Sequence, residues 1–279
     1  MIVLCYINSS DFVYKDSPTV VTIGNFDGFH KGHKILINKL NEIKLDTAAK
    51  SLIFSFRPRP VEVFKNMRIK SILSAAEKVE VASSLGIDIF VEYPFSVEFS
   101  KMSGEEFVGN ILIERLNCKH IIVGSGFAFG KDRAWDAAKI SDICKEQGIA
   151  FTALPHELAG EEKISSTTIR KYLENGEIAR VNELLGYDYY ALGEIRELRD
   201  EEPLIAVAVD DWKLLPKIGK YMVEISLKKD KTFRCIADID SEVSQIYISP
   251  AIESYNNFSA LNSGDKIVVN FKDYLEGET

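Results

Sequence analysis

Short β-rich runs alternate with stretches of helical character between residues 19 and 154, and this alternation constrains the fold more than any other feature. The β-rich runs are apolar and β-branched, as in strands buried on both faces of a sheet. They cover 19–24, 51–56, 89–93, 120–124 and 150–154. Helical patterns fill the intervals at 31–44, 74–85, 103–116 and 136–147. The alternation predicts a parallel sheet with right-handed crossovers, which binds ligands beyond the carboxyl ends of its strands.

Local signals mark the ends of these helices. Ser74 is followed by Glu77, and Ser103 by Glu106, which is the spacing of a capping box. Gly148 follows the last helical stretch and suits the left-handed position after a helix. These residues predict two helix starts and one helix end.

The pattern changes after residue 165. Two helices are predicted at 166–175 and 177–185, separated by Asn175 and Gly176. A β-rich tail with turn signals then covers 189–196, 204–210, 220–228, 232–239, 244–249 and 266–271. We therefore expect an α/β domain at 1–187, followed by a small antiparallel β-barrel-like domain at 188–279.

Composition excludes several classes of protein. Hydrophobic residues make up 46% and charged residues 27%, an ordinary globular balance. The net charge of −8 argues against a general binder of nucleic acid or of anionic membranes. No apolar run is long enough to span a membrane, the N-terminus lacks a signal-peptide pattern, and the four cysteines form no CxxC. We expect a soluble cytoplasmic protein, and the sequence leaves its oligomeric state unknown.

The segment 24–33, GNFDGFHKGH, carries the strongest chemical signal. It follows a predicted strand and opens a predicted helix, where backbone N–H groups and the helix dipole favour an anion. Gly24 and Gly28 allow a tight turn and a close approach of the backbone to a ligand, and Gly32 leaves room between two histidines. The segment is a predicted phosphate site.

His30 and His33 are three residues apart and would share one face of a helical turn. Two imidazoles aimed at one point could stabilise the charge that grows on a phosphate under attack. A zinc site is a weaker alternative, because His120 and His156 show no ligand spacing. Asp27 fits a turn-stabilising role or a metal or water-mediated contact.

The second signal is the segment 164–170, ISSTTIR, which opens another predicted helix. Ser165, Ser166 and Thr167 would offer hydroxyl and N–H groups to the outer phosphates of a nucleoside triphosphate. Arg170, one turn further on, could neutralise pyrophosphate as it leaves. The alternative is a plain N-cap of serines with a solvated arginine.

Together the two segments resemble the nucleotidylyltransferase superfamily, through HxGH after a strand and SSTxxR later in the chain. More closely, GNFDGFHKGH and ISSTTIRKYLENGEI with the later LLG are similar to the bacterial bifunctional riboflavin kinase/FMN adenylyltransferase (FAD synthetase) family. The resemblance covers nearly all of residues 1–193. Further matching segments are FxPxP at 56–60, EKVE at 77–80, SGEEFV at 103–108 and VGSGFAFGKDR at 123–133.

This resemblance implies a Rossmann-like nucleotidylyltransferase domain that transfers AMP from ATP to FMN, with Mg²⁺ as cofactor. The FMN phosphate would attack the α-phosphate in line and release pyrophosphate, without a covalent enzyme intermediate. By the same resemblance, His30, His33 and Arg170 would be the catalytic residues. ATP would be bound by Gly24, Asn25, Phe26, Asp27, Gly28, Gly32, Ser165, Ser166 and Thr167. The flavin would be bound by Phe56, Pro58, Arg59, Phe127 and Phe129, with core packing as the alternative for the last two.

The residues expected near the acceptor, FMN, depart from the family pattern. Gly126 stands where the family has Asp or Asn, and Arg57-Pro58-Arg59-Pro60 where it has Asp-Pro-His-Pro. A lost carboxylate and two added guanidiniums predict a more positive surface, which could pair with the FMN phosphate or serve another acceptor. Two alternatives to an FMN adenylyltransferase therefore stay open, a nucleotidylyltransferase for another phosphorylated acceptor and a non-catalytic flavin- or nucleotide-binding protein.

The β-rich tail departs further from the family pattern. The family's kinase module is a six-stranded barrel with a Gly-rich stretch followed by Pro-Thr-Ala-Asn, whereas residues 196–203 read RELRDEEP. An acidic run repels phosphates. Gly219 and Tyr221 do match a kinase-module strand, and Glu278 could stand near the kinase's catalytic Glu. We predict a degenerate riboflavin-kinase-like barrel without riboflavin kinase activity.

Overall fold

The computed structural model describes residues 5–7, 11–130, 134–155, 158–159, 162–199, 204–227, 231–240, 245–251 and 261–275. The chain forms two compact units. The first unit contains residues 1–69 and 78–163, and the second contains 70–77 and 164–279. Helices over 166–185 therefore pack with the β-rich tail. The functional boundary expected near residue 187 stays a prediction.

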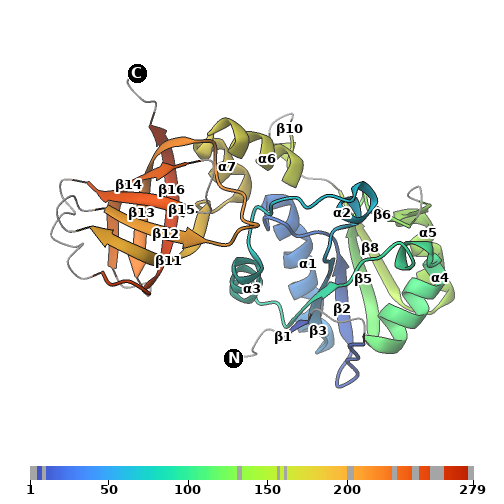
Figure 1. The fold of residues 1–279 in the computed structure, drawn as a ribbon. Coiled ribbons are helices and arrows are strands. Elements are labelled where there is room, and N and C mark those ends of the chain that lie inside the picture. Colours follow the sequence, from blue (N-terminus) through green and yellow to red (C-terminus); the bar gives the residue numbers. More distant parts are fainter. Residues whose placement is uncertain are drawn as a thin grey trace. The chain divides into compact units, whose positions relative to one another are not determined.

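A six-stranded parallel sheet forms the centre of the first unit, in the order β1-β4-β3-β2-β5-β8 (Figure 1). The strands are β1 (Cys5–Ile7), β2 (Thr19–Ile23), β3 (Lys50–Phe56), β4 (Ile89–Tyr93), β5 (Cys118–Gly124) and β8 (Ala150–Leu154). All five residues of β2 are buried, as expected for a strand covered on both faces. The five predicted strands are confirmed, and β1 is an additional edge strand.

Helices connect the strands as the alternation predicts. They are α1 (Lys31–Thr47), α2 (Pro60–Lys65), α3 (Ala75–Ser84), η1 (Phe99–Lys101), α4 (Gly104–Glu106), the π-helical η2 (Phe107–Arg115) and α5 (Ala137–Glu146). The capping box is confirmed at Ser103, whose N–H and Oγ both bond to Glu106. Gly148 has φ +69° and takes the left-handed position after α5. The predicted helix over 103–116 forms, but most of it is π-helical rather than α-helical.

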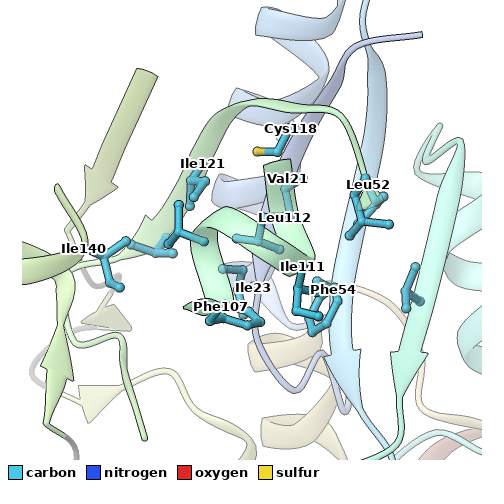
Figure 2. Close-up of a cluster of buried hydrophobic side chains, with 14 of the residues drawn as sticks. Val21, Ile23, Leu52, Phe54, Phe107, Ile111, Leu112, Cys118, Ile121 and Ile140 are labelled. Carbon is cyan, nitrogen blue, oxygen red and sulfur yellow. The ribbon is translucent and has the colours of Figure 1, made fainter. Parts of the chain in front are cut away.

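The core of the first unit lies between the sheet and η2 (Figure 2). Phe107, Ile111 and Leu112 of η2 meet side chains of the neighbouring strands β2 and β3. Those partners include Val21, Ile23, Leu52 and Phe54. Each large apolar side chain buried here contributes about 1.5–3 kcal/mol relative to exposure. The packing fixes the carboxyl ends of β2 and β3, from which the candidate site begins.

Short antiparallel pairs complete the first unit. They are β6 (Ala128–Phe129) with β7 (Trp135–Asp136), and β9 (Leu158–Ala159) with β10 (Glu162–Lys163). His156 lies outside the described residues.

A closed antiparallel barrel forms the second unit, in the order β11-β12-β15-β14-β13-β16 (Figure 1, orange to red). Its strands are β11 (Tyr190–Arg199), β12 (Leu204–Val209), β13 (Gly219–Leu227), β14 (Lys231–Ile239), β15 (Gln245–Pro250) and β16 (Lys266–Leu275). The predicted barrel is confirmed. Residues 200–203 of the acidic run and Glu278 lie outside the described residues.

Two helices precede the barrel, α6 (Ser166–Asn175) and α7 (Ile178–Leu185). Gly176 and Gly186 end them in the left-handed conformation, with φ +83° and +70°. The predicted break at Asn175 and Gly176 is confirmed. No helix among the described residues is long and apolar enough to cross a membrane.

Candidate active site

The turn between β2 and α1 has an unusual backbone. Phe26 and Phe29 have φ of +43° and +44°, and both side chains are fully buried. Neither Gly24 nor Gly28 has a positive φ, so the left-handed residues of this turn are the two phenylalanines. Their aromatic packing holds a strained backbone, which is common at functional sites. Gly24 leaves room for the Phe26 ring, since an added Cβ would lie 3.1 Å from it.

His30 is the N-cap of α1. Its Nδ1 accepts a hydrogen bond from the backbone N–H of His33 at 3.3 Å. A neutral imidazole has one acceptor and one donor nitrogen, so Nε2 of His30 carries the proton. The rings of His30 and His33 stack, with centroids 3.6 Å apart and planes 15° apart. The predicted shared face of the two histidines is therefore present.

Both histidines are neutral near pH 7. Burial lowers the pKa of His30 from 6.5 to about 4, although the nearby carboxylate of Asp27 raises it in part. Burial also lowers the pKa of His33 well below its ordinary value, and the neighbouring His30 adds to this effect. The buried Nδ1 of His33 has no hydrogen-bond partner among the described residues. An unpartnered polar atom of this kind is typical of a site that awaits a ligand.

Asp27 is buried and forms an ion pair with Arg59, with 3.2 Å between Oδ2 and Nη1. Arg59 also contacts Glu62 through Nε at 3.2 Å and the carbonyl of Ile69 through Nη2 at 2.5 Å. The pair connects the β2–α1 turn to the start of α2. It supports the turn-stabilising role considered for Asp27.

Arg57 directly follows β3 and is half exposed. Its Nη1 is 3.4 Å from Glu92, a buried carboxylate that also accepts a bond from Lys78 at 2.8 Å. Both arginines that depart from the family pattern thus have carboxylate partners. The extra positive charge expected from the sequence is balanced within the first unit.

Aromatic side chains gather beside the carboxyl ends of β3 and β4. Phe56 lies 5.7 Å from Phe99 between ring centroids, and Phe99 lies 6.0 Å from Phe107. The ring centroids of Phe107 and Phe129 are 4.8 Å apart, and those of Phe129 and Phe127 are 6.0 Å apart. The cluster therefore brings together three of the residues predicted to bind flavin.

The other members of this group differ in exposure. Pro58 is exposed, whereas Phe127 and Phe129 are partly buried and pack against the core, as the alternative from the sequence expects. Sequence reasoning missed Phe95 and Phe99. The segment YPFSVEF that contains them has no regular period, so the only available signal was its aromatic content.

The second motif belongs to the second unit. Ser165 is the N-cap of α6, and its Oγ accepts from the N–H of Thr168 at 3.2 Å. Ser166 and Arg170 are partly buried, and Thr167 is exposed. Nη1 of Arg170 donates to the carbonyl oxygen of Lys70 at 2.5 Å. The serine cap considered from the sequence is present, and it orders a helix N-terminus with N–H groups that suit an anion.

Comparisons with known proteins decide the family. Residues 13–168, more than half of the chain, match the family model described as FAD synthetase. The chain belongs to the FAD synthetase family. An FAD synthetase of Listeria monocytogenes is 34% identical over 213 residues, which cover 75% of this chain and 83% of the relative. A bifunctional riboflavin kinase/FMN adenylyltransferase of the same organism is 31% identical over 220 residues, covering 76% and 69%.

A solved structure shares the fold of the whole chain. A crystal structure from Streptococcus pneumoniae, described as a macrolide-efflux protein, matches with a TM-score of 0.84 and covers 100% of this chain and 92% of its own. Its sequence identity of 22% supports a shared fold and nothing more specific. The described residues of this chain hold no group of three or more His, Cys, Asp or Glu arranged for a metal ion.

Proposed function

We propose that the chain is an FMN adenylyltransferase that makes FAD from FMN and ATP. A phosphate oxygen of FMN attacks the α-phosphorus of ATP and forms a new P–O bond. The bond from the α-phosphorus to the bridging oxygen of the β-phosphate breaks, and pyrophosphate leaves with that electron pair. The stacked pair of neutral histidines at the N-terminus of α1, in a member of the FAD synthetase family, carries this proposal.

The α-phosphate is assigned to the turn before α1. The Nε2–H of His30 would donate to an oxygen on which negative charge grows during attack, which stabilises the transition state more than the ground state. His33 would act beside it, since its buried Nδ1 lacks a protein partner. Neutral imidazoles suit this role because they need not lose a proton or be recharged between turnovers.

The β- and γ-phosphates are assigned to the start of α6. The first-turn N–H groups of Ser166 and Thr167 have no acceptor inside the helix and face its positive end. Ser165 holds this turn in place through its bond to Thr168. Arg170 would neutralise pyrophosphate as it forms. ATP would enter as its Mg²⁺ complex, with the ion carried on the phosphate oxygens as part of the substrate.

The isoalloxazine ring is assigned to the aromatic cluster of the first unit. A large planar ligand favours apolar and aromatic walls. Phe127 and Phe129 remain partly exposed although they pack on the core, so their rings can still meet a ligand. Phe56 and Pro58 would complete this wall, while Arg59 keeps the turn at Asp27 in place.

We also propose that the barrel does not phosphorylate riboflavin. This rests on residues 196–203, which lack the Gly-rich stretch and the Pro-Thr-Ala-Asn of the kinase module. The barrel fold itself is intact. The absence of riboflavin kinase activity would therefore result from missing motif residues and not from a changed fold.

Labelled ATP tests the reaction directly. With FMN and ATP labelled at the α-phosphate, the label should enter FAD, and with γ-labelled ATP it should leave in pyrophosphate. A panel of other phosphomonoesters should give no adenylylated product. Label entering another acceptor in preference to FMN would favour the alternative nucleotidylyltransferase, and ATP binding without turnover would favour a binding protein.

A further inference from the structure

Lys213 is a lysine whose charge is buried in the second unit. Its side chain is 0% exposed, and its Nζ donates to three oxygens. These are Oε2 of Glu77 at 2.7 Å, the carbonyl of Ile72 at 2.7 Å and the carbonyl of Tyr190 at 2.6 Å. The Tyr189 ring lies below it, with 4.4 Å from Nζ to the centroid. All three hydrogens of the ammonium group therefore have acceptors.

Two of these acceptors lie in the segment 70–77, which is far from Lys213 in sequence. The backbone of this segment also pairs with the loop after β12. Ser71 N–H donates to the Trp212 carbonyl at 2.6 Å, and Leu214 N–H donates to the Ser71 carbonyl at 2.7 Å. Lys213 thus fixes the segment at Ile72 and at Glu77, while the backbone pair fixes it at Ser71.

The residue next to Ser71 orients Arg170. The carbonyl oxygen of Lys70 accepts from Nη1 of Arg170 at 2.5 Å. A carbonyl can hold a guanidinium in one direction only if its own peptide is held. The bonds at Ser71 and Lys213 hold that peptide.

The barrel also anchors the C-terminal end of the helix that carries Arg170. The N–H of Lys217 donates to the Leu173 carbonyl at 2.8 Å. Gly176 ends α6 against the barrel, where an added Cβ would lie 3.3 Å from the hydroxyl of Tyr221. Arg170 is thus held through α6 at one side and through Lys70 at the other.

We propose that Lys213 is a positioning residue for ATP, which acts through the segment 70–77 to set the direction of the Arg170 guanidinium. This inference rests on the proposed function, because it takes Arg170 to contact the leaving phosphates. It gives the barrel a part in adenylyl transfer that is independent of riboflavin phosphorylation.

Stability alone is a poor account of this buried ion pair. Taking both charges out of water costs several kcal/mol per ion, and well-packed apolar replacements of such pairs are often equally stable. An apolar side chain at position 213 could not donate hydrogen bonds to Ile72, Glu77 and Tyr190. The arrangement therefore favours a role in fixing geometry.

The test compares Lys213→Met with the double variant Lys213→Met/Glu77→Gln. The double variant avoids an unpaired carboxylate, and Gln can still serve in the capping box with Ser74. We expect kcat/KM for ATP to fall by about 10-fold, since small misplacements of a catalytic group reduce rates strongly. The KM for FMN should stay within about 2-fold. Lys213→Arg keeps the positive charge, so its kcat/KM for ATP should fall by less.

A double-mutant cycle with Arg170→Ala separates positioning from a structural role. If Lys213 acts through Arg170, the Lys213 substitution should change kcat/KM for ATP by less than about 2-fold once Arg170 is absent. Lys220→Met is the matched control, because Lys220 is an exposed lysine on β13. It should leave every kinetic constant unchanged.

Three outcomes would overturn the inference while FAD is still made by the wild-type chain. These are unchanged ATP constants in a folded Lys213 variant, full additivity with Arg170→Ala, and failure of every Lys213 variant to fold, which would assign Lys213 to stability alone. Failure of the proposed function would be distinct, because the wild-type chain itself would then make no FAD.

Discussion

Nδ1 of His30 accepts the backbone N–H of His33, and this single bond fixes the proton of His30 on the opposite nitrogen. The same residue therefore caps α1 and presents an N–H donor at the helix N-terminus. The low pKa of His30 keeps that donor uncharged. The two roles can be separated by substitution.

His30→Asn should keep the cap and remove the phosphate donor. Asn is among the best N-cap residues, and its Oδ1 can accept the His33 N–H. Because the cap is kept, His30→Asn should lose less stability than a variant that also loses the cap. The loss of one transition-state donor should lower kcat by at least about 100-fold. Chemical denaturation and steady-state kinetics on the same preparation measure both quantities.

His30→Ala is the companion variant. It should lose about 1 kcal/mol of stability as well, because both the cap and the donor are gone. Unchanged turnover in a well-folded His30→Asn protein would refute the assignment of the α-phosphate to this turn.

Stability should fall as the pH falls from 6.5 towards 4. The unfolded chain binds a proton on His30 at about pH 6.5, whereas the folded chain binds it only near pH 4. The unfolded state thus holds more protons in this window, and the free energy of unfolding rises with pH across it. About 2 kcal/mol should be lost between pH 6.5 and 5, at about 1.4 kcal/mol per unit.

Denaturant titrations at several pH values check this slope. His30→Asn removes the titrating group, so its stability should depend less on pH in the same window. An equal dependence in both proteins would mean that the His30 ring is not held neutral by burial.

Arg59 and Arg57 should differ sharply in their contribution to stability. Arg59→Ala removes the cation from the buried carboxylate of Asp27 and should cost about 3 kcal/mol. Arg57→Ala should cost less than about 1 kcal/mol, because Arg57 is half exposed and Lys78 still holds Glu92. Thermal and chemical unfolding of the two variants provide the comparison, and equal losses would contradict the assignment of Arg59 to the turn.

Phe127→Ala should weaken the binding of FMN and leave the binding of ATP unchanged. Phe127 is partly buried and lies at the outer end of the aromatic cluster, next to Phe129. We expect KM for FMN to rise about 10-fold, which corresponds to about 1.4 kcal/mol of lost stacking. KM for ATP should not change. A loss of stability of several kcal/mol with normal FMN kinetics would instead assign Phe127 to the core.

The arrangement of strands and helices was predictable because its signals are local. β2 and β5 are apolar runs of the right length, and Ser103 with Glu106 forms a capping box in sequence and in space alike. β1 was missed because three residues carry no period. The left-handed backbone of Phe26 was missed because a fully buried ring holds it, which local propensity does not anticipate.

The candidate site was predictable only in its motif residues. His30 and His33 share a face because they are three apart, so their stacking follows from spacing. The partner of Arg59 is 32 residues away and that of Lys213 is 136 residues away, and nothing in a single sequence pairs them. Arg59 was assigned to the flavin for this reason, and that assignment stays a prediction beside its observed bond to Asp27.

Adenylyl transfer to FMN is tested most directly by a product assay of the purified chain with ATP and Mg²⁺, using FMN in one tube and riboflavin in the other. We expect FAD from FMN and no phosphorylated flavin from riboflavin. FMN or FAD formed from riboflavin would contradict the loss of kinase activity. The absence of FAD from FMN, in a folded protein, would contradict the proposed adenylyl transfer itself.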